Sequence, residues 1–188
     1  MASNGRDPVA GLTAEEFSVR FQSGARVLWT LAAGLLGDGA EAEDVCQEAF
    51  LAAYGKRDQF DPGTSFLAWM GRFVRNVAAN ELRKRARRQT ASTDPLVLDR
   101  ETAFAGAATR PEHELYDHEE FDERLLSGLR ELGDVPRSCL LLRTLRELSY
   151  AEIAALLEVP EGTAMSHVHR ARLALRAKLD PTFDGVRP

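Results

Sequence analysis

Apolar residues recur along the chain at the three- and four-residue spacing of an α-helix, and no stretch shows the strict alternation of a β-strand. Turn signals separate the periodic stretches, the clearest being Gly37-Asp38-Gly39 and Asp61-Pro62-Gly63. The pattern predicts seven helices, over residues of about 12–36, 40–54, 65–88, 121–132, 135–145, 149–157 and 160–179. The expected fold class is therefore all-α.

Two of the predicted helices carry clear positional signals. In the second helix, Val45, Ala49 and Ala52 are expected to face inward. The third helix can be capped by Thr64 or Ser65, because a hydroxyl oxygen there can accept a hydrogen bond from the first turn. It becomes increasingly basic toward its end.

The segment from Leu148 onward has the pattern of a helix-turn-helix motif. Ser149 and Glu152 have the spacing of a capping box, in which each side chain bonds the backbone N–H of the other residue. A short helix is then followed by the turn Glu158-Val159-Pro160 and a longer helix. Helical hairpins of this shape also occur as plain packing units, so the motif alone leaves both interpretations open.

The last helix has one apolar side and one polar side. The apolar side is the expected core face, with Ala164, Val168, Ala171, Leu175 and Leu179. The polar side and its flanks hold small hydroxyls, imidazoles and a guanidinium, which suit contacts with phosphates and base edges. We predict DNA contacts here from Thr163, Ser166, His167, His169 and Arg170.

Composition narrows the class of protein. The 188 residues are 44% hydrophobic and 28% charged, which allows a packed core and argues against disorder throughout. No apolar run approaches the roughly 20 residues of a membrane span, and the N-terminus lacks the pattern of a secretory signal. We expect a cytoplasmic protein with no membrane insertion of its own.

The net charge of −5 hides a segregated pattern. Between Trp69 and Thr90, seven cations against one carboxylate give +6, and Pro160–Lys178 carries +3. Between these two, Pro111–Asp134 has nine acidic and two basic residues, or −7. Two basic patches favour contact with a polyanion at two surfaces. Ordinary solvated helix faces, and cations that favour a helix C-terminus, are the competing explanations.

Two separated motifs together resemble the extracytoplasmic-function (ECF) group of bacterial sigma-70-like sigma factors. Residues 41–50 (EAEDVCQEAF) look like the region 2.2 helix of that family, and residues 65–76 running into 82–85 are similar to its regions 2.3 and 2.4. The run SYAEIA at 149–154, with PEGT at 160–163 and HRAR at 169–172, resembles region 4. The resemblance covers residues 17 to 179 apart from a linker.

The resemblance implies partners and site residues. Region 2 of such factors docks on the β′ clamp helices of core RNA polymerase and melts the −10 promoter element, whereas region 4 reads the −35 element and packs on the β flap. An anti-sigma factor usually holds such proteins inactive. The positions matching the polymerase-docking face are Asp44, Gln47, Glu48 and Leu51. Those around the −10 DNA are Phe60, Trp69, Arg72, Arg75, Asn76, Asn80, Arg83 and Lys84.

Physical chemistry is consistent with that assignment: an aromatic ring can stack on an unpaired base, an amide can read its edge, and arginines can hold the backbone. The alternatives are a loop-anchoring role for Phe60 and a plain surface amide for Asn76. Met165 and His167 stand at positions that are usually positive in the family, which predicts weaker or altered −35 recognition.

The implied organisation is two small helical domains. We expect a disordered N-terminus (1–11), region 2 (12–89), a flexible linker (90–118), region 4 (119–180) and a tail (181–188). No catalytic constellation, cofactor motif or metal site stands out, so the chain is not expected to be an enzyme. Cys46 and Cys139 are expected to be buried structural thiols, with a redox switch as the alternative. A helix-turn-helix regulator that works without polymerase is the alternative function.

Overall fold

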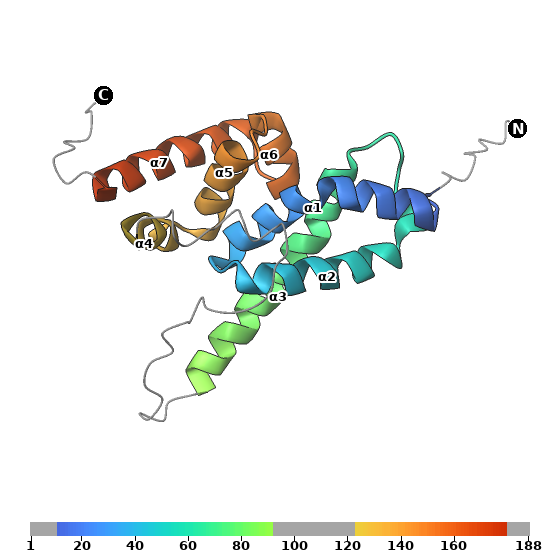
Figure 1. Ribbon diagram of the computed structural model, residues 1–188, viewed down its shortest axis with the longest axis horizontal. Helices are drawn as coiled ribbons and strands as arrows, with labels where there is room; N and C mark the ends of the chain where they lie inside the picture. The colour runs from blue at the N-terminus through green and yellow to red at the C-terminus, as the bar shows by residue number, and fades with distance from the viewer. Residues whose placement is uncertain (1–10, 92–122, 180–188) are drawn as a thin grey trace, which may run out of the picture.

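The structure is a computed structural model that describes residues 11–91 and 123–179. The described residues form seven α-helices and one 3-10 turn, with no strand among them. The helices are α1 (Ala14–Leu36), α2 (Ala40–Tyr54), α3 (Phe66–Ala91), α4 (Glu123–Glu131), α5 (Asp134–Leu145), α6 (Tyr150–Leu157) and α7 (Glu161–Leu179), with η1 (Arg57–Gln59) between α2 and α3 (Figure 1). The predicted all-α fold class is confirmed.

Helices α1 to α3 form the N-terminal unit. A capping box starts α1, since the Glu16 N–H donates to Thr13 Oγ1 (3.2 Å) and the Thr13 N–H donates to the Glu16 carboxylate (2.9 Å). Gly37 ends α1 in the left-handed region at φ 71°. The unit's core includes the completely buried Phe17 of α1, which makes edge contacts with the rings of aromatic residues on α2 and α3.

The predicted inward face of α2 is partly wrong. Val45 and Ala49 are buried as expected, but Ala52 is exposed and Ala53 takes its place in the core. Ala53 follows Ala49 by four residues, so both lie on the same side of the helix, whereas Ala52 lies on the side that faces solvent. The C-terminal turns of α3 project away from the rest of the unit (Figure 1).

Helices α4 to α7 form the C-terminal unit. The predicted capping box at the start of α6 is present, with the Glu152 N–H donating to Ser149 Oγ (3.2 Å) and the Ser149 N–H donating to the Glu152 carboxylate (2.8 Å). A turn at Glu158 connects α6 to α7 and gives the predicted helix-turn-helix. Ala164, Val168 and Ala171 form the buried side of α7, as expected, while Leu179 at its end is 38% exposed.

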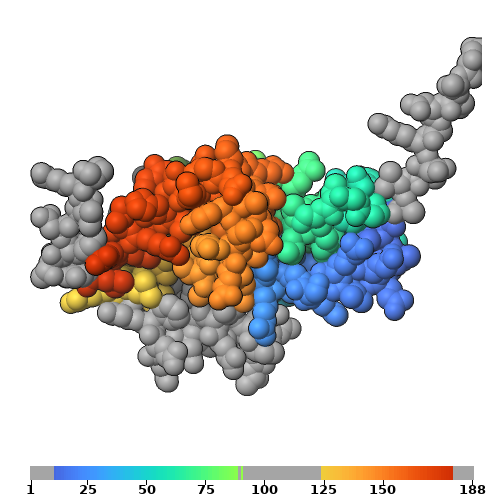
Figure 2. Space-filling model, turned by 90° about the horizontal axis from the view of Figure 1, so that it is seen from above, coloured from blue at the N-terminus to red at the C-terminus, as the bar shows by residue number. Residues whose placement is uncertain are grey.

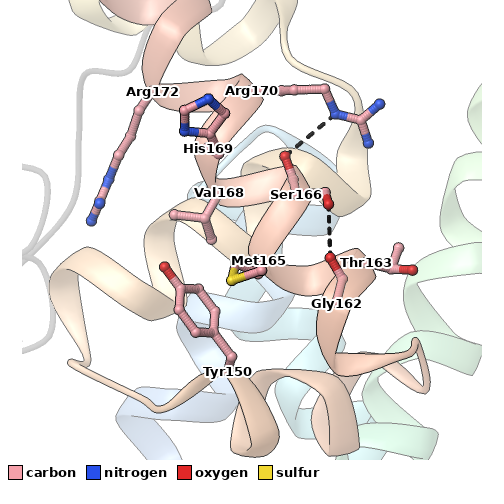
Figure 3. Close-up of a pocket in the computed structure, with 9 residues that line it drawn as sticks. All are labelled: Tyr150, Gly162, Thr163, Met165, Ser166, Val168, His169, Arg170 and Arg172. Carbon is pink, nitrogen blue, oxygen red and sulfur yellow. Dashed lines mark hydrogen bonds between the residues drawn. The ribbon is translucent and has the colours of Figure 1, made fainter. Parts of the chain in front are cut away.

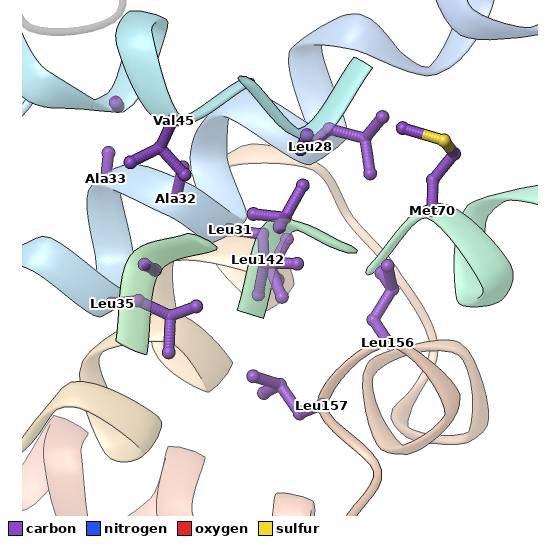
Figure 4. Packing of buried hydrophobic residues seen from close by; sticks show 14 of the residues in the cluster. Leu28, Leu31, Ala32, Ala33, Leu35, Val45, Met70, Leu142, Leu156 and Leu157 are labelled. Carbon is purple, nitrogen blue, oxygen red and sulfur yellow. The ribbon is translucent and has the colours of Figure 1, made fainter. Parts of the chain in front are cut away.

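The two units pack directly against each other, α1 on α5 and α3 on α6. Figure 2 shows them side by side, and Figure 4 shows leucines of both units in one cluster, including Leu31 of α1 and Leu142 of α5. Gly34 allows α1 and α5 to approach closely, because a Cβ there would lie 2.6 Å from Ser138 Oγ. Most of the expected N-terminus, most of the expected linker and the whole expected tail lie outside the described residues.

Candidate functional site

The first candidate surface lies on α2. We call the predicted residues Asp44, Gln47, Glu48 and Leu51 the docking face. All four are exposed and lie on one side of the helix, and Leu51 is 69% exposed despite being apolar. An exposed leucine among carboxylates and an amide is typical of a protein-binding surface.

An apolar groove runs along this face, with a volume of about 440 Å³. Phe21 and Trp29 of α1 form one wall, and Phe50 and Leu51 of α2 contribute to the other. Cys46 also lines the groove, so this thiol is only partly buried and the expectation of a buried cysteine is wrong at this position. The groove has room for apolar side chains of a partner helix between α1 and α2.

The second candidate surface is the basic side of α3. Arg72, Asn76, Asn80 and Arg83 follow one another by three or four residues and are all exposed; we call these four residues the α3 polar face. Arg83 donates to the Asn80 side-chain oxygen (2.8 Å), which fixes the direction of that amide. Lys84, next along the helix, pairs with Glu81 at 3.1 Å. These groups offer hydrogen-bond donors and positive charge to a nucleic-acid backbone.

Two other predicted residues on this side are less accessible. Trp69 is partly buried, with its ring against Phe60 and Phe73 at centroid distances of 5.3 and 4.9 Å. Arg75 is also partly buried, and its guanidinium pairs with Glu158 of the C-terminal unit at 2.6 Å. Both side chains therefore support the structure as well as bordering the α3 polar face.

Phe60 is not placed where the sequence analysis expected it. Its ring is completely buried, packed against Phe66 and Trp69 at 5.7 and 5.3 Å and covered by the Arg20 guanidinium at 5.7 Å. The 3-10 turn Arg57–Gln59 directs the chain so that Phe60 enters the core. In this structure neither face of the ring is open to a base, and the ring packs in the way that the loop-anchor alternative describes.

The third candidate surface lies on α7, where the predicted residues Thr163, Ser166, His167, His169 and Arg170 form what we call the recognition face. Together with Met165 and Tyr150, most of them line a concave site of about 770 Å³ (Figure 3). Met165 is 52% exposed, and its side chain lies near Tyr150 (Figure 3). An open concavity beside the N-terminal half of the second helix is where a helix-turn-helix meets the major groove.

Hydrogen bonds organise the recognition face. Ser166 Oγ donates to the Gly162 carbonyl (2.8 Å), and Arg170 Nε donates to the Ser166 carbonyl (3.3 Å). Arg170 Nη2 also lies 3.4 Å from His167 Nδ1. Partial burial lowers the pKa of His167 below its usual value, and the positive charge of Arg170 lowers it further. His167 is therefore neutral at neutral pH in the unbound protein.

Comparison with known families and proteins gives a consistent result. The Sigma-70 region 2 family model matches residues 21–88, and the Sigma-70 region 4 model matches residues 122–175. The chain is 31% identical over 157 residues to the ECF RNA polymerase sigma factor SigW of Bacillus subtilis, covering 81% of this chain and 82% of that protein. It is 35% identical over 145 residues to the ECF RNA polymerase sigma-E factor of Escherichia coli K12, covering 75% of each. The chain belongs to the ECF sigma factors of RNA polymerase.

Solved structures agree with this membership. The sigma factor is similar to RpoE of Bartonella quintana, solved in complex with the anti-sigma factor NepR, with a TM-score of 0.66 and 26% identity over 88% of this chain and 98% of that chain. It also shares the fold of CnrH, solved in complex with the cytosolic domain of CnrY, with a TM-score of 0.59 and 23% identity over 91% and 92% of the two chains.

Sequence reasoning missed several residues at these surfaces of the sigma factor. Phe21 and Trp29 of α1 form the far wall of the docking groove, and neither was among the predicted site residues. Tyr150 borders the recognition face although the sequence suggested only its place in a helix N-terminus. Within the described residues, no cluster of His, Cys, Asp and Glu could hold a metal ion, and none of the helices there has the length and apolar character of a membrane span.

Proposed function

We propose that this sigma factor binds core RNA polymerase through the docking face on α2 and the adjoining groove. The proposal rests on one observation above all: the exposed Leu51 and an apolar groove adjoin carboxylates on α2, a helix without a basic residue, while the two predicted DNA-contact surfaces lie on α3 and α7. A surface that combines apolar area with negative charge suits a basic protein partner and repels nucleic acid. The β′ clamp helices of the polymerase are the proposed partner of this face, and the β flap that of the C-terminal unit.

The two cationic surfaces then divide promoter recognition between them. The α3 polar face, with Lys84, is proposed to hold the −10 element, where amides can read an unpaired base and guanidinium groups bind phosphates. The recognition face on α7 is proposed to read the −35 element in the major groove. The polymerase supplies the chemistry of RNA synthesis, so the sigma factor itself acts without being an enzyme, in the cytoplasm with the polymerase.

An anti-sigma factor is the proposed regulator. Both structural neighbours described above were solved with a partner of this kind or with the cytosolic domain of a partner. The docking groove on α2 is the proposed point of competition, because an inhibitor that fills it would exclude the polymerase.

Co-elution with core RNA polymerase in gel filtration at moderate salt tests the proposal. The wild-type chain should co-elute, and the double charge reversal Asp44→Lys with Glu48→Lys should reduce co-elution. A matched double variant, Glu15→Lys with Glu147→Lys, changes the net charge equally at exposed carboxylates outside the docking face and should behave as wild type. If the folded wild-type chain fails to co-elute but selects specific duplex sequences by itself, the alternative of a polymerase-independent regulator is favoured.

A further inference from the structure

An ion pair between the two units involves Arg72 of the α3 polar face and its neighbour Arg75, both of which the family resemblance places around the −10 DNA. Arg72 Nε lies 3.3 Å from a Glu158 carboxylate oxygen, and Arg75 Nη2 lies 2.6 Å from the same atom. Arg75 also donates a hydrogen bond to the Leu156 carbonyl at the end of α6. The helix-turn-helix thus presents a carboxylate and a carbonyl to the guanidinium groups of α3. Both are oxygen acceptors, as phosphate oxygens are, and they can bind the same N–H donors.

The backbone at Glu158 makes this contact more informative. Glu158 is the C-cap of α6 with φ 54° and ψ 45°, a left-handed conformation that favours glycine over residues with a side chain. A glutamate is therefore less favourable than glycine for the backbone of this turn. Its carboxylate, however, forms ion pairs with two arginines of α3. The side chain therefore has a role at the interface that glycine could not provide.

A second contact joins the units at the end of α1. No basic residue lies in the last turn of α1, and its free carbonyls receive a guanidinium from α5 instead. Arg137 donates to the Gly34 carbonyl (2.6 Å) and to the Leu35 carbonyl (3.2 Å). Arg146 adds a hydrogen bond of 2.8 Å to the Thr30 hydroxyl. These contacts hold α5 against α1 while Glu158 holds the turn against α3.

We infer that this closed arrangement is an autoinhibited state of the free sigma factor, in which Glu158 occupies the guanidinium groups of Arg72 and Arg75 that DNA phosphates would otherwise bind. Carboxylate and phosphate compete for the same donors, so the closed state and full nucleic-acid binding by α3 exclude each other. Only 16% of the Arg75 side chain is exposed in the closed state, against 65% for Arg72, so Arg75 is the arginine that closure covers most. The DNA part of this inference rests on the proposed function, whereas the closure itself does not.

Two substitutions, one in the α6–α7 turn and one in α1, should open the interface while each unit keeps its fold. Glu158→Gly removes the carboxylate and relieves the left-handed backbone, so the turn itself should become more favourable. Gly34→Ala suits the interior of α1, yet its methyl group would lie 2.7 Å from Ser138 Cα and must push α5 away. The matched controls are Glu147→Gly, at the other left-handed glutamate (φ 55°), and Gly162→Ala, where nothing lies within 4 Å of the added carbon.

The experiment measures the radius of gyration by small-angle X-ray scattering and the affinity for a fluorescein-labelled single-stranded 20-nucleotide DNA. Glu158→Gly and Gly34→Ala should increase the radius of gyration, whereas Glu147→Gly and Gly162→Ala should not. Glu158→Gly should tighten DNA binding about twofold to fivefold, the range expected from releasing a partly exposed ion pair. Glu147→Gly, which removes the same charge, should have a clearly smaller effect.

Each other outcome counts against the inference in a different way. An unchanged radius of gyration in both opening variants would show that these contacts do not hold the units together. A larger radius with DNA affinity no better than that of Glu147→Gly would show that closure does not inhibit. If the opening variants expand but neither they nor the wild type bind DNA with core polymerase present, the proposed function fails while the closed state stands.

Discussion

Arg137 Nε donates a hydrogen bond of 2.6 Å to the backbone carbonyl of Gly34, a residue 103 positions earlier in the chain. The arginine is only 5% exposed, and its other donors reach the Leu35 and Leu132 carbonyls and the Asp134 carboxylate. A buried guanidinium is tolerated when its donors are satisfied, and here most of the acceptors are backbone carbonyls near helix ends. One side chain thus completes α1 and joins the two units.

Arg137→Met should therefore lower the free energy of unfolding by about 3 kcal/mol, because the methionine fills similar space but leaves several buried carbonyls without donors. Denaturant unfolding followed by circular dichroism measures the change. Arg130→Met removes an exposed arginine from the same unit and should change stability by less than about 0.5 kcal/mol. A similar small effect for Arg137→Met would show that water replaces the guanidinium at these carbonyls.

The capping box of α6 predicts a stability effect that depends on pH. Ser149→Ala should cost about 1 kcal/mol near neutral pH. Hydrogen bonds from the Ser149 hydroxyl and N–H lower the pKa of Glu152, so the folded state binds its proton less tightly than the unfolded state does. The Glu152 carboxylate therefore makes its full contribution to the free energy of unfolding above the pKa of glutamate in the unfolded chain, about 4.3. That contribution is lost as the pH falls through the lower pKa of Glu152 in the folded protein.

Denaturant unfolding of wild type and Ser149→Ala at pH 7 and at about pH 3.5 checks this effect, with the difference shrinking at the lower pH. Ser23→Ala is the control, since Ser23 is an exposed serine inside α1 that bonds only the backbone of its own helix. A Ser149→Ala penalty that is the same at both pH values would contradict a role for the Glu152 carboxylate in the box.

Local signals in the sequence were sufficient to predict the helices. Three features depend only on neighbouring residues and can be predicted without tertiary contacts: the capping box at Ser149, the turn at Asp61-Pro62-Gly63 and the helix end at Gly37. The positions of the recognition face also followed from helical periodicity, and those of the docking face from the family resemblance together with that spacing. These parts of the candidate site were predictable because each face belongs to a single helix.

Features that depend on contacts distant in the sequence could not be predicted in this way. Arg137 looks like an ordinary charged residue near a helix start, and nothing local indicates that it binds the end of α1. Phe60 looks like an aromatic residue in an open loop, and only the packing of Phe66 and Trp69 shows that it is buried. The groove wall of Phe21 and Trp29 likewise becomes visible only once α2 is placed beside α1.

The two thiols should differ strongly in reactivity. Burial raises the pKa of Cys139 to about 11, so roughly one molecule in a thousand carries the thiolate at pH 8. Cys46 is partly exposed in the docking groove. Iodoacetamide under native conditions should modify Cys46 first, with Cys139 reacting only after unfolding, as mass spectrometry of peptides would show. Rapid native alkylation of Cys139 would revive the redox-switch alternative.

The recognition face predicts how added charge changes DNA binding. Met165→Arg and His167→Arg each place a permanent cation beside Ser166 and Arg170, so each should tighten binding to a −35-containing duplex. Each should also steepen the slope of log affinity against log salt concentration by about the amount that one added phosphate contact gives. Because the pKa of His167 is lowered in the free protein, the wild-type imidazole is neutral at about pH 7.5 and can gain a proton near phosphates as the pH falls. The gain from His167→Arg should therefore be larger at about pH 7.5 than at about pH 5.5.

Fluorescence anisotropy titrations at the two pH values and at several salt concentrations measure these effects. Leu173→Arg is the control, because Leu173 is exposed on the same helix but lies beyond the recognition face. The gain from Met165→Arg should be the same at both pH values, since methionine does not titrate. If Leu173→Arg tightens duplex binding as much as the other two variants, the effect reflects general attraction to a polyanion, and the assignment of Met165 and His167 to the DNA contact fails.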